Sequence, residues 1–174
     1  DIAQWGLGMD DSGPVEILPP PNAGDNSGAT LVYASGITVK HVEGHPLDVR
    51  SVDFVGSSGR VRVTRDKFIF ERDGQTIAQY RGKEDEDTSL TQQVRKAEDL
   101  YLKNAKVKLY VSNNHISDFL QCVRERKKPI TSEQVGARTA ICCHLMNLAY
   151  YHGQKIKWDP AKFAFAGGAG DPKW

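Results

Sequence analysis

Short runs of β-branched and aromatic residues between positions 30 and 81 constrain the fold more than any other feature of this chain. Apolar and polar residues alternate within the runs, and clusters of Gly, Ser and Asp separate them, as at residues 56–59 and 73–74. This pattern is typical of antiparallel strands joined by tight turns. Arg60, Arg62 and Thr64 occupy alternate positions, so we expect one face of the sheet to be less buried than the other. The predicted strands of this meander are residues 31–33, 37–42, 49–55, 61–63, 68–70 and 76–80.

Helical signals dominate the C-terminal third. Four apolar residues recur at the i, i+3, i+4, i+7 spacing of one helix face, and Asn113 or Asn114 can cap that helix. They are Ile116, Phe119, Leu120 and Val123. Thr131 and Gln134 then fit a capping box before a longer helix that ends at Gly153. The residues expected to point inward from this second helix are Val135, Thr139, Cys142, Met146 and Ala149.

The remaining segments complete an α+β pattern. Residues 1–7 read as the end of a helix, residues 14–18 as a strand, residues 90–101 as a polar helix and residues 107–111 as a short strand. Because strands and helices are segregated along the chain, we predict an open, mostly antiparallel β-sheet with helices packed on one face.

Length and charge exclude several classes of protein. The 174 residues predict a single domain spanning 1–174. A net charge of +1 argues against a nucleic-acid binder, and no apolar run is long enough to span a membrane. Three Cys imply no disulfide framework. The chain starts at Asp1 with dense apolar residues, so we expect this start to lie inside a longer protein.

Residue spacing alone names no reaction. Residues 142–144, Cys-Cys-His, point in different directions on a helix and cannot converge on one ion. No Gly-rich phosphate loop follows a strand and opens a helix, and no nucleophile motif is recognisable.

Three stretches carry a resemblance to a known family. The first is residues 1–8, DIAQWGLG, and the second is residues 48–59, DVRSVDFVGSSG. The third consists of residues 107–110, 114–115, 119–123, 126–129, 135–138, 143–145 and 153–160. In this order they are similar to the C-terminal domain of the glucose–fructose oxidoreductase, inositol dehydrogenase and MocA family (Gfo/Idh/MocA), in a bacterial subgroup of dehydrogenases. Asp53 stands where that family usually has Glu.

The resemblance implies the substrate and oligomerisation domain of an NAD(P)-dependent oxidoreductase acting on a sugar or polyol. In the family an N-terminal Rossmann domain binds NAD or NADP, and neighbouring subgroups use NAD transiently for redox-neutral sugar chemistry. Asp1 matches the last residue of the family's catalytic motif, so the catalytic and cofactor-binding residues are expected upstream and the isolated chain is expected to be inactive. A homo-oligomer would form through the sheet face, where apolar residues are left for a partner. These residues are Val61, Val63, Phe68 and Phe70.

Three residues are candidate substrate contacts. His45 lies just before the second stretch, His115 opens the first C-terminal helix, and Arg138 lies on the second. Each has an alternative role. His45 would be an ordinary polar residue of the sheet, His115 a helix-terminal or surface residue, and Arg138 a partner in an internal salt bridge. The alternative function is a non-enzymatic assembly or carbohydrate-binding module with the same fold. The compartment stays open between cytoplasm and periplasm.

Overall fold

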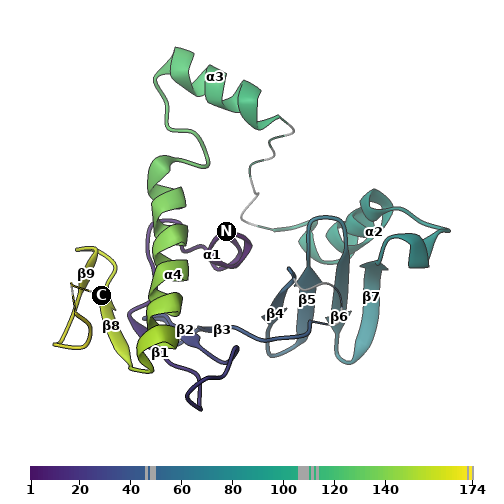
Figure 1. The fold of residues 1–174 in the computed structure, drawn as a ribbon. Helices are drawn as coiled ribbons and strands as arrows, with labels where there is room; N and C mark the ends of the chain where they lie inside the picture. The colour runs from purple at the N-terminus through teal and green to yellow at the C-terminus, as the bar shows by residue number, and fades with distance from the viewer. Residues whose placement is uncertain are drawn as a thin grey trace. The chain divides into compact units, whose positions relative to one another are not determined.

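The chain folds into two compact units, each built on an open antiparallel sheet (Figure 1). The computed structural model describes residues 1–45, 47, 50–105, 110, 112, 114–171 and 173. Unit 1 combines residues 1–43 with residues 112–174, and unit 2 is the intervening segment, residues 44–111. The predicted α+β class with open antiparallel sheets is confirmed, and the strands are divided between two sheets.

Unit 1 holds a five-stranded sheet in the order β3-β2-β1-β8-β9, and every described pair in it is antiparallel. Its strands are β1 (Glu16–Leu18), β2 (Thr30–Val32), β3 (Thr38–Lys40), β8 (Ile156–Asp159) and β9 (Ala164–Phe165). Its helices are α1 (Ile2–Gly6), α3 (His115–Glu125) and α4 (Glu133–His152). Helix α4 packs against β1 and β2 (Figure 1). Sheet and helix together enclose the core of the unit.

An apolar row crosses the sheet of unit 1 and forms that core. Leu31 pairs with Ile17 in the neighbouring strand, and Ile17 pairs in turn with Ile156. Ile17 and Ile156 are fully buried. The buried residues that α4 adds to the row are Cys142, Leu145 and Ala149. Their spacing of three and four positions is that of one helix face, so the helix and the sheet bury complementary surfaces.

A buried polar contact fixes α1 against this sheet. The Tyr33 hydroxyl donates to Oε1 of Gln4, whose residue is only 5% exposed. Gln4 Nε2 in turn faces the carbonyl oxygens of Met9 and Ser12, at 3.3 and 3.4 Å. Burial also raises the pKa of the Tyr33 phenol, so that group stays a neutral donor. The polar side chain of Gln4 is therefore satisfied inside the unit.

Unit 2 is a meander of four strands, in the order β4-β5-β6-β7. The strands are β4 (Val52–Val55), β5 (Gly59–Val63), β6 (Phe68–Arg72) and β7 (Gln75–Tyr80). A 3₁₀ helix η1 (Lys83–Asp85), helix α2 (Leu90–Ala97) and a π-helical turn η2 (Glu98–Leu102) follow. Ser89 and Gln92 form a capping box at the start of α2, and α2 packs against β7.

The alternation of residues gives the sheet of unit 2 two different faces. One face is apolar, and on it Val61 pairs with Phe70 and Val63 pairs with Phe68. Phe68 is buried, and the Phe70 ring meets the Tyr101 ring edge-on at 5.2 Å between centroids. The chain itself therefore covers part of the face that was expected to meet a partner. The opposite face is polar, as the positions of Arg60 and Arg62 predicted.

Local predictions hold for most elements and fail at one cap. Asn114 caps α3 as expected, and Gly153 ends α4 in the left-handed conformation. The predicted capping box of Thr131 and Gln134 is wrong, because Ser132 is the N-cap and makes no side-chain cap bond. The Gln134 side chain instead accepts a hydrogen bond from Lys128 Nζ at 2.5 Å. Of the predicted strand at residues 107–111, only residue 110 lies among the described residues.

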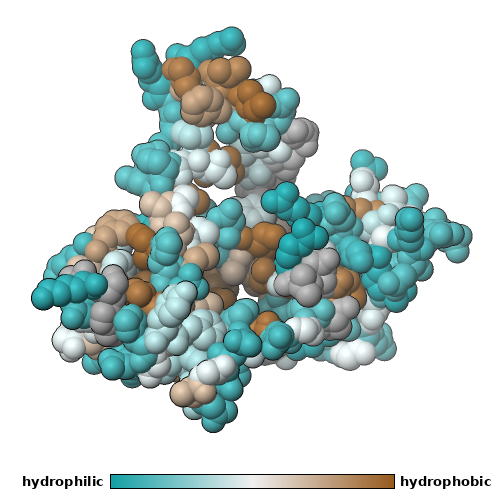
Figure 2. All heavy atoms as spheres, in the orientation of Figure 1, coloured by the Kyte–Doolittle hydropathy of each residue, from teal (hydrophilic) through white to brown (hydrophobic). Residues whose placement is uncertain are grey.

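The apolar face of α3 is a second difference from expectation. The four residues that predicted the helix do lie on it, but they are 47–60% exposed. Figure 2 shows the hydrophobic patch over this helix. They are Ile116, Phe119, Leu120 and Val123. Periodicity thus predicted the helix correctly without predicting what it contacts.

Candidate functional site

The polar face of the unit 2 sheet carries a cross-strand row of side chains. Asp53 in β4 pairs with Arg62 in β5, Arg62 pairs with Ile69 in β6, and Ile69 pairs with Gln79 in β7. Side chains of residues that lie directly opposite each other in antiparallel strands point to the same face, so these four share one face. Strand pairing therefore places charged groups from separate sequence segments next to each other.

Asp53 is the centre of a charge cluster on this face. Its carboxylate lies 3.5 Å from Arg60 Nε and 3.5 Å from Arg62 Nε. Arg62 Nη2 also lies 3.2 Å from the Glu71 carboxylate, and the Arg62 side chain is only 16% exposed. Partial burial strengthens such interactions relative to a fully solvated surface pair. The cluster thus holds the Arg62 guanidinium in a defined position on the sheet.

His45 contributes a buried donor to the same cluster. Its Nδ1 accepts a hydrogen bond from the Leu47 backbone N–H at 3.1 Å, so in the neutral ring the proton is on Nε2. Nε2 lies 3.8 Å from an Asp53 carboxylate oxygen, and the His45 side chain is 7% exposed. Nε2 of His45, Oδ1 of Asp53 and Nε of Arg62 are buried without a hydrogen-bond partner among the described residues. The cluster therefore retains unused hydrogen-bonding capacity, which is uncommon for buried polar atoms.

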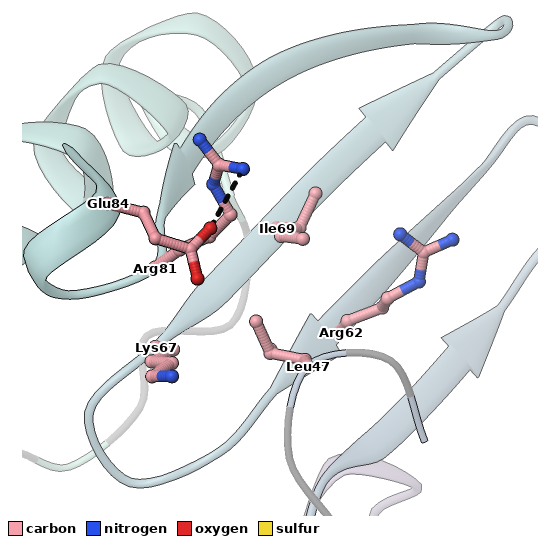
Figure 3. Close-up of a pocket in the computed structure, with 6 residues that line it drawn as sticks. All are labelled: Leu47, Arg62, Lys67, Ile69, Arg81 and Glu84. Atoms are coloured by element: carbon pink, nitrogen blue, oxygen red, sulfur yellow. Dashed lines mark ion pairs between the residues drawn. The ribbon is translucent and has the colours of Figure 1, made fainter. Parts of the chain in front are cut away.

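A pocket of about 240 Å³ opens beside this cluster. Figure 3 shows the apolar side chains of Leu47 and Ile69 between Arg62 on one side and Arg81 with Glu84 on the other. Lys67, the residue before β6, lies along its edge. The lining combines planar cationic donors, a carboxylate acceptor and an apolar centre. All six lining residues belong to unit 2.

Ion pairs fix one wall of the pocket. Arg81 makes a forked contact with Asp85, with Nη2 at 2.8 Å from Oδ1 and Nε at 3.1 Å from Oδ2. Arg81 Nη1 also lies 3.2 Å from Glu84 Oε2. The hydrogen bond from Arg81, opposed by partial desolvation, lowers the pKa of the Asp85 carboxyl. The forked pair anchors η1 against the end of β7 and so orients Glu84 at the pocket.

The structure gives the three candidate substrate contacts different surroundings. His45 lies in the charge cluster beside the pocket. His115 is the exposed first residue of α3, and Arg138 lies on α4, both in unit 1. Arg138 Nη1 donates to the Pro160 carbonyl at 2.9 Å, and its guanidinium carbon lies 4.7 Å from the Phe163 ring centroid. These contacts tie α4 to the chain after β8, which is a structural role.

Sequence reasoning missed the residues that line the pocket. Arg62 was identified only as part of a polar face, and Glu84 belongs to the charged run 83–87, which is typical of a solvated loop. Lys67 and Arg81 were not singled out. The available signal was the alternation of charged residues along β5, together with the charged segment after β7. Recognising the pocket from that signal would have required the strand register.

The described residues do not fit a dinucleotide site. Such sites use parallel strands joined by a helix, with a Gly-rich turn at the start of that helix. The described strand pairs are all antiparallel, and an Ala166–Ala169 bridge closes the Gly-rich segment 166–170 into a turn. Nor do any three described His, Cys, Asp or Glu side chains come together as a metal site. Within the described part of the chain, no helix has the length and apolar character needed to cross a bilayer.

Comparison of the chain with family models, with curated proteins and with solved structures found no match. The resemblance to the Gfo/Idh/MocA family therefore stays a prediction from the sequence.

Proposed function

We propose that this chain is the substrate-binding part of an NAD(P)-dependent oxidoreductase that acts on a sugar or polyol, and that the unit 2 pocket contacts the sugar. The observation that carries the proposal is the lining of the pocket. Arg62 and Arg81 supply donors, Glu84 supplies an acceptor, and Leu47 with Ile69 supplies an apolar patch.

A monosaccharide requires this combination of groups. Its hydroxyls both donate and accept hydrogen bonds, and its C–H face is apolar, so a site needs planar polar groups around an apolar contact. The pocket volume of about 240 Å³ is smaller than the roughly 300–1,000 Å³ typical of sites for drug-sized ligands. A single sugar ring therefore suits it better than an oligosaccharide.

The charge cluster supports the pocket from the side. Asp53 and Glu71 hold Arg62 by contacts at 3.5 and 3.2 Å, so less side-chain entropy is lost when Arg62 meets a ligand. His45 acts through Asp53 in this proposal, and we assign it a positioning role. Hydride transfer would need NAD or NADP, which the resemblance assigns to a separate N-terminal domain. The chain alone is therefore expected to bind sugar without oxidising it.

NMR titration of the isotope-labelled chain with glucose or myo-inositol tests sugar binding. Shifts should concentrate in the amides of β5, β6 and η1. Glu84→Gln, which replaces one carboxylate oxygen by an amide donor and removes the charge, should weaken binding by about tenfold or more, since hydrogen bonds to charged groups contribute about 1.5–3 kcal/mol. Glu86→Gln is the matched control, because Glu86 is also exposed but does not line the pocket. Shifts confined to unit 1, or equal weakening by both variants, would contradict the proposal.

A non-enzymatic carbohydrate-binding module is the second candidate. The observation that favours it is the antiparallel topology of both sheets, in which the described residues form no dinucleotide site. The coding sequence upstream of Asp1 separates the two candidates. An open reading frame that encodes a Gly-rich strand–turn–helix motif supports the enzyme, and a start codon at that point supports the module. Micromolar affinity of residues 1–174 for NAD, measured by calorimetry, would contradict the assignment of the cofactor to another domain.

A further inference from the structure

We infer that the sugar bound in the unit 2 pocket carries an acidic group, a carboxylate or a phosphate, and that Lys67 binds it. This inference rests on the proposed function and specifies the substrate class of the same site. Its starting point is the balance of charge around the pocket. Three cations and one carboxylate line it, which leaves a local excess of positive charge.

Two of the three cations already have carboxylate partners. Arg62 lies between Asp53 and Glu71, at 3.5 and 3.2 Å. Arg81 is held by Glu84 and Asp85, at 3.2 and 2.8 Å. These carboxylates offset the charge of both guanidinium groups. Neither arginine is therefore the main source of attraction for an anion.

Lys67 is the cation without a compensating partner among the described residues. No ion pair or hydrogen bond in the described part of the chain involves its ammonium group, although four carboxylates occur in the surrounding ion pairs. They are Asp53, Glu71, Glu84 and Asp85. The other two cations of the pocket have carboxylate partners, whereas this ammonium group has none among the described residues. Its uncompensated positive charge attracts an anionic ligand.

The backbone around Lys67 places this charge at the pocket. Lys67 follows the β5–β6 turn and precedes Phe68, a buried residue of β6. Gly82 has a φ of 82°, which turns the chain after β7. The Lys67 Cε atom lies 3.7 Å from the position that a β-carbon on Gly82 would occupy. The aliphatic stem thus packs beside Gly82, with its ammonium group at the pocket edge.

The geometry favours a ligand with both hydroxyls and a terminal acid. Lys presents a compact charge with three donors, which suits a carboxylate or a phosphate oxygen at the edge of the pocket. The ring hydroxyls would then face Arg62 and Glu84 across Ile69. A free anion would use Lys67 alone and leave the rest of the lining unused. The lining as a whole therefore favours a sugar acid or a sugar phosphate over a neutral sugar or a free anion.

The test is a set of titrations of the full chain at constant ionic strength, followed by NMR. The ligands are glucose, glucuronate, glucose 6-phosphate, acetate and inorganic phosphate. We expect both acidic sugars to bind at least about fivefold more tightly than glucose, the gain of a charge-assisted contact. Lys67→Gln should lower the affinity for both acidic sugars to about the level that the same variant shows for glucose. Arg65→Gln is the matched control, because it removes a nearby exposed charge that does not line the pocket.

The outcomes distinguish failure of this inference alone from failure of the proposed function. If glucose binds as tightly as the acidic sugars, or if Lys67→Gln and Arg65→Gln have equal effects, the inference about the acid fails and the proposed function stands. If acetate or phosphate binds as tightly as the acidic sugars, the pocket does not recognise a sugar and both proposals fail. Absence of binding by every ligand also overturns both. The ratio of the glucuronate and glucose 6-phosphate affinities identifies the acid that the site prefers.

Discussion

Replacement of Ile17 by Ala is the most direct test of how unit 1 is held together. Ile17 is fully buried at the middle of the sheet, between Leu31 in β2 and Ile156 in β8. Helix α4 covers this row with Cys142, Leu145 and Ala149. A shortened side chain here removes contacts with both neighbouring strands at once. These neighbouring residues come from two strands and a helix, which limits how far the site can collapse.

The expected loss of stability follows from the atoms removed. Ile→Ala deletes three buried carbons, worth about 0.8 kcal/mol each in transfer free energy, or about 2.4 kcal/mol together. A residual cavity adds to this, so we expect a loss of about 3–4 kcal/mol, inside the range of about 2–5 kcal/mol for such replacements. Ile17→Val deletes one carbon and should cost about 0.5–1.5 kcal/mol. The two variants thus predict a graded series at one position.

Urea unfolding followed by tryptophan fluorescence measures these losses of stability in unit 1. Of the three tryptophans, Trp5 and Trp158 lie among the described residues, and both belong to unit 1. The slope of the free energy with urea should stay constant while the midpoint falls. Val42→Ala is the control, because Val42 is 55% exposed and should cost less than about 0.5 kcal/mol. A loss for Ile17→Ala no larger than that of the control would refute the assignment of Ile17 to the core.

Three further predictions concern single sites. Gly59→Ala places a β-carbon 2.3 Å from the backbone carbonyl oxygen of Glu71 in β6, which is too close for the strands to stay in place. Hydrogen exchange of the β5 and β6 amides should show a loss of stability above about 1 kcal/mol, and unchanged protection would contradict this pairing. Burial raises the pKa of the Cys142 thiol to about 11, so iodoacetamide at pH 8 should label the exposed Cys143 before Cys142. Mass spectrometry measures the order of labelling, and early labelling of Cys142 would count against its burial. Because Arg81 lowers the pKa of Asp85, the pair stabilises unit 2 above the usual Asp range and that stabilisation is lost as pH falls through the lowered value. Carbon-13 NMR should find this midpoint raised in Arg81→Gln, and an unchanged midpoint would argue against the forked pair.

Most of the secondary structure of this chain can be predicted from local sequence patterns. The β6–β7 hairpin follows from alternating residues around Asp73 and Gly74, and α3 follows from its periodicity and from Asn114. Local patterns do not determine which distant strands pair. Glu16 in β1 pairs with Lys157 in β8, and no residue of either strand indicates its partner. For the same reason the sequence predicted one sheet, whereas the structure has two.

The candidate site was less predictable than the fold. His45 was identified through the family resemblance, and the structure places it beside Asp53. The pocket residues come from separate strands and from the segment after β7, so their proximity depends on register. A register shift between Phe70 and Glu71 in the pairing of β6 with β7 sets which side chains of β7 share the polar face. Alternation alone cannot reveal such an irregularity, because it assumes an unbroken ladder.

The pairing of β1 with β8 has a consequence for how the chain folds during synthesis. Ile17 and Ile156 are separated by most of the sequence, and the whole of unit 2 lies between them. The four strands of unit 2 are consecutive, so they can form their meander soon after that segment leaves the ribosome. The central strands of unit 1 must wait until the C-terminal residues are made. Closing so long a loop slows folding, so the early strands, β1 to β3, stay exposed to aggregation longest.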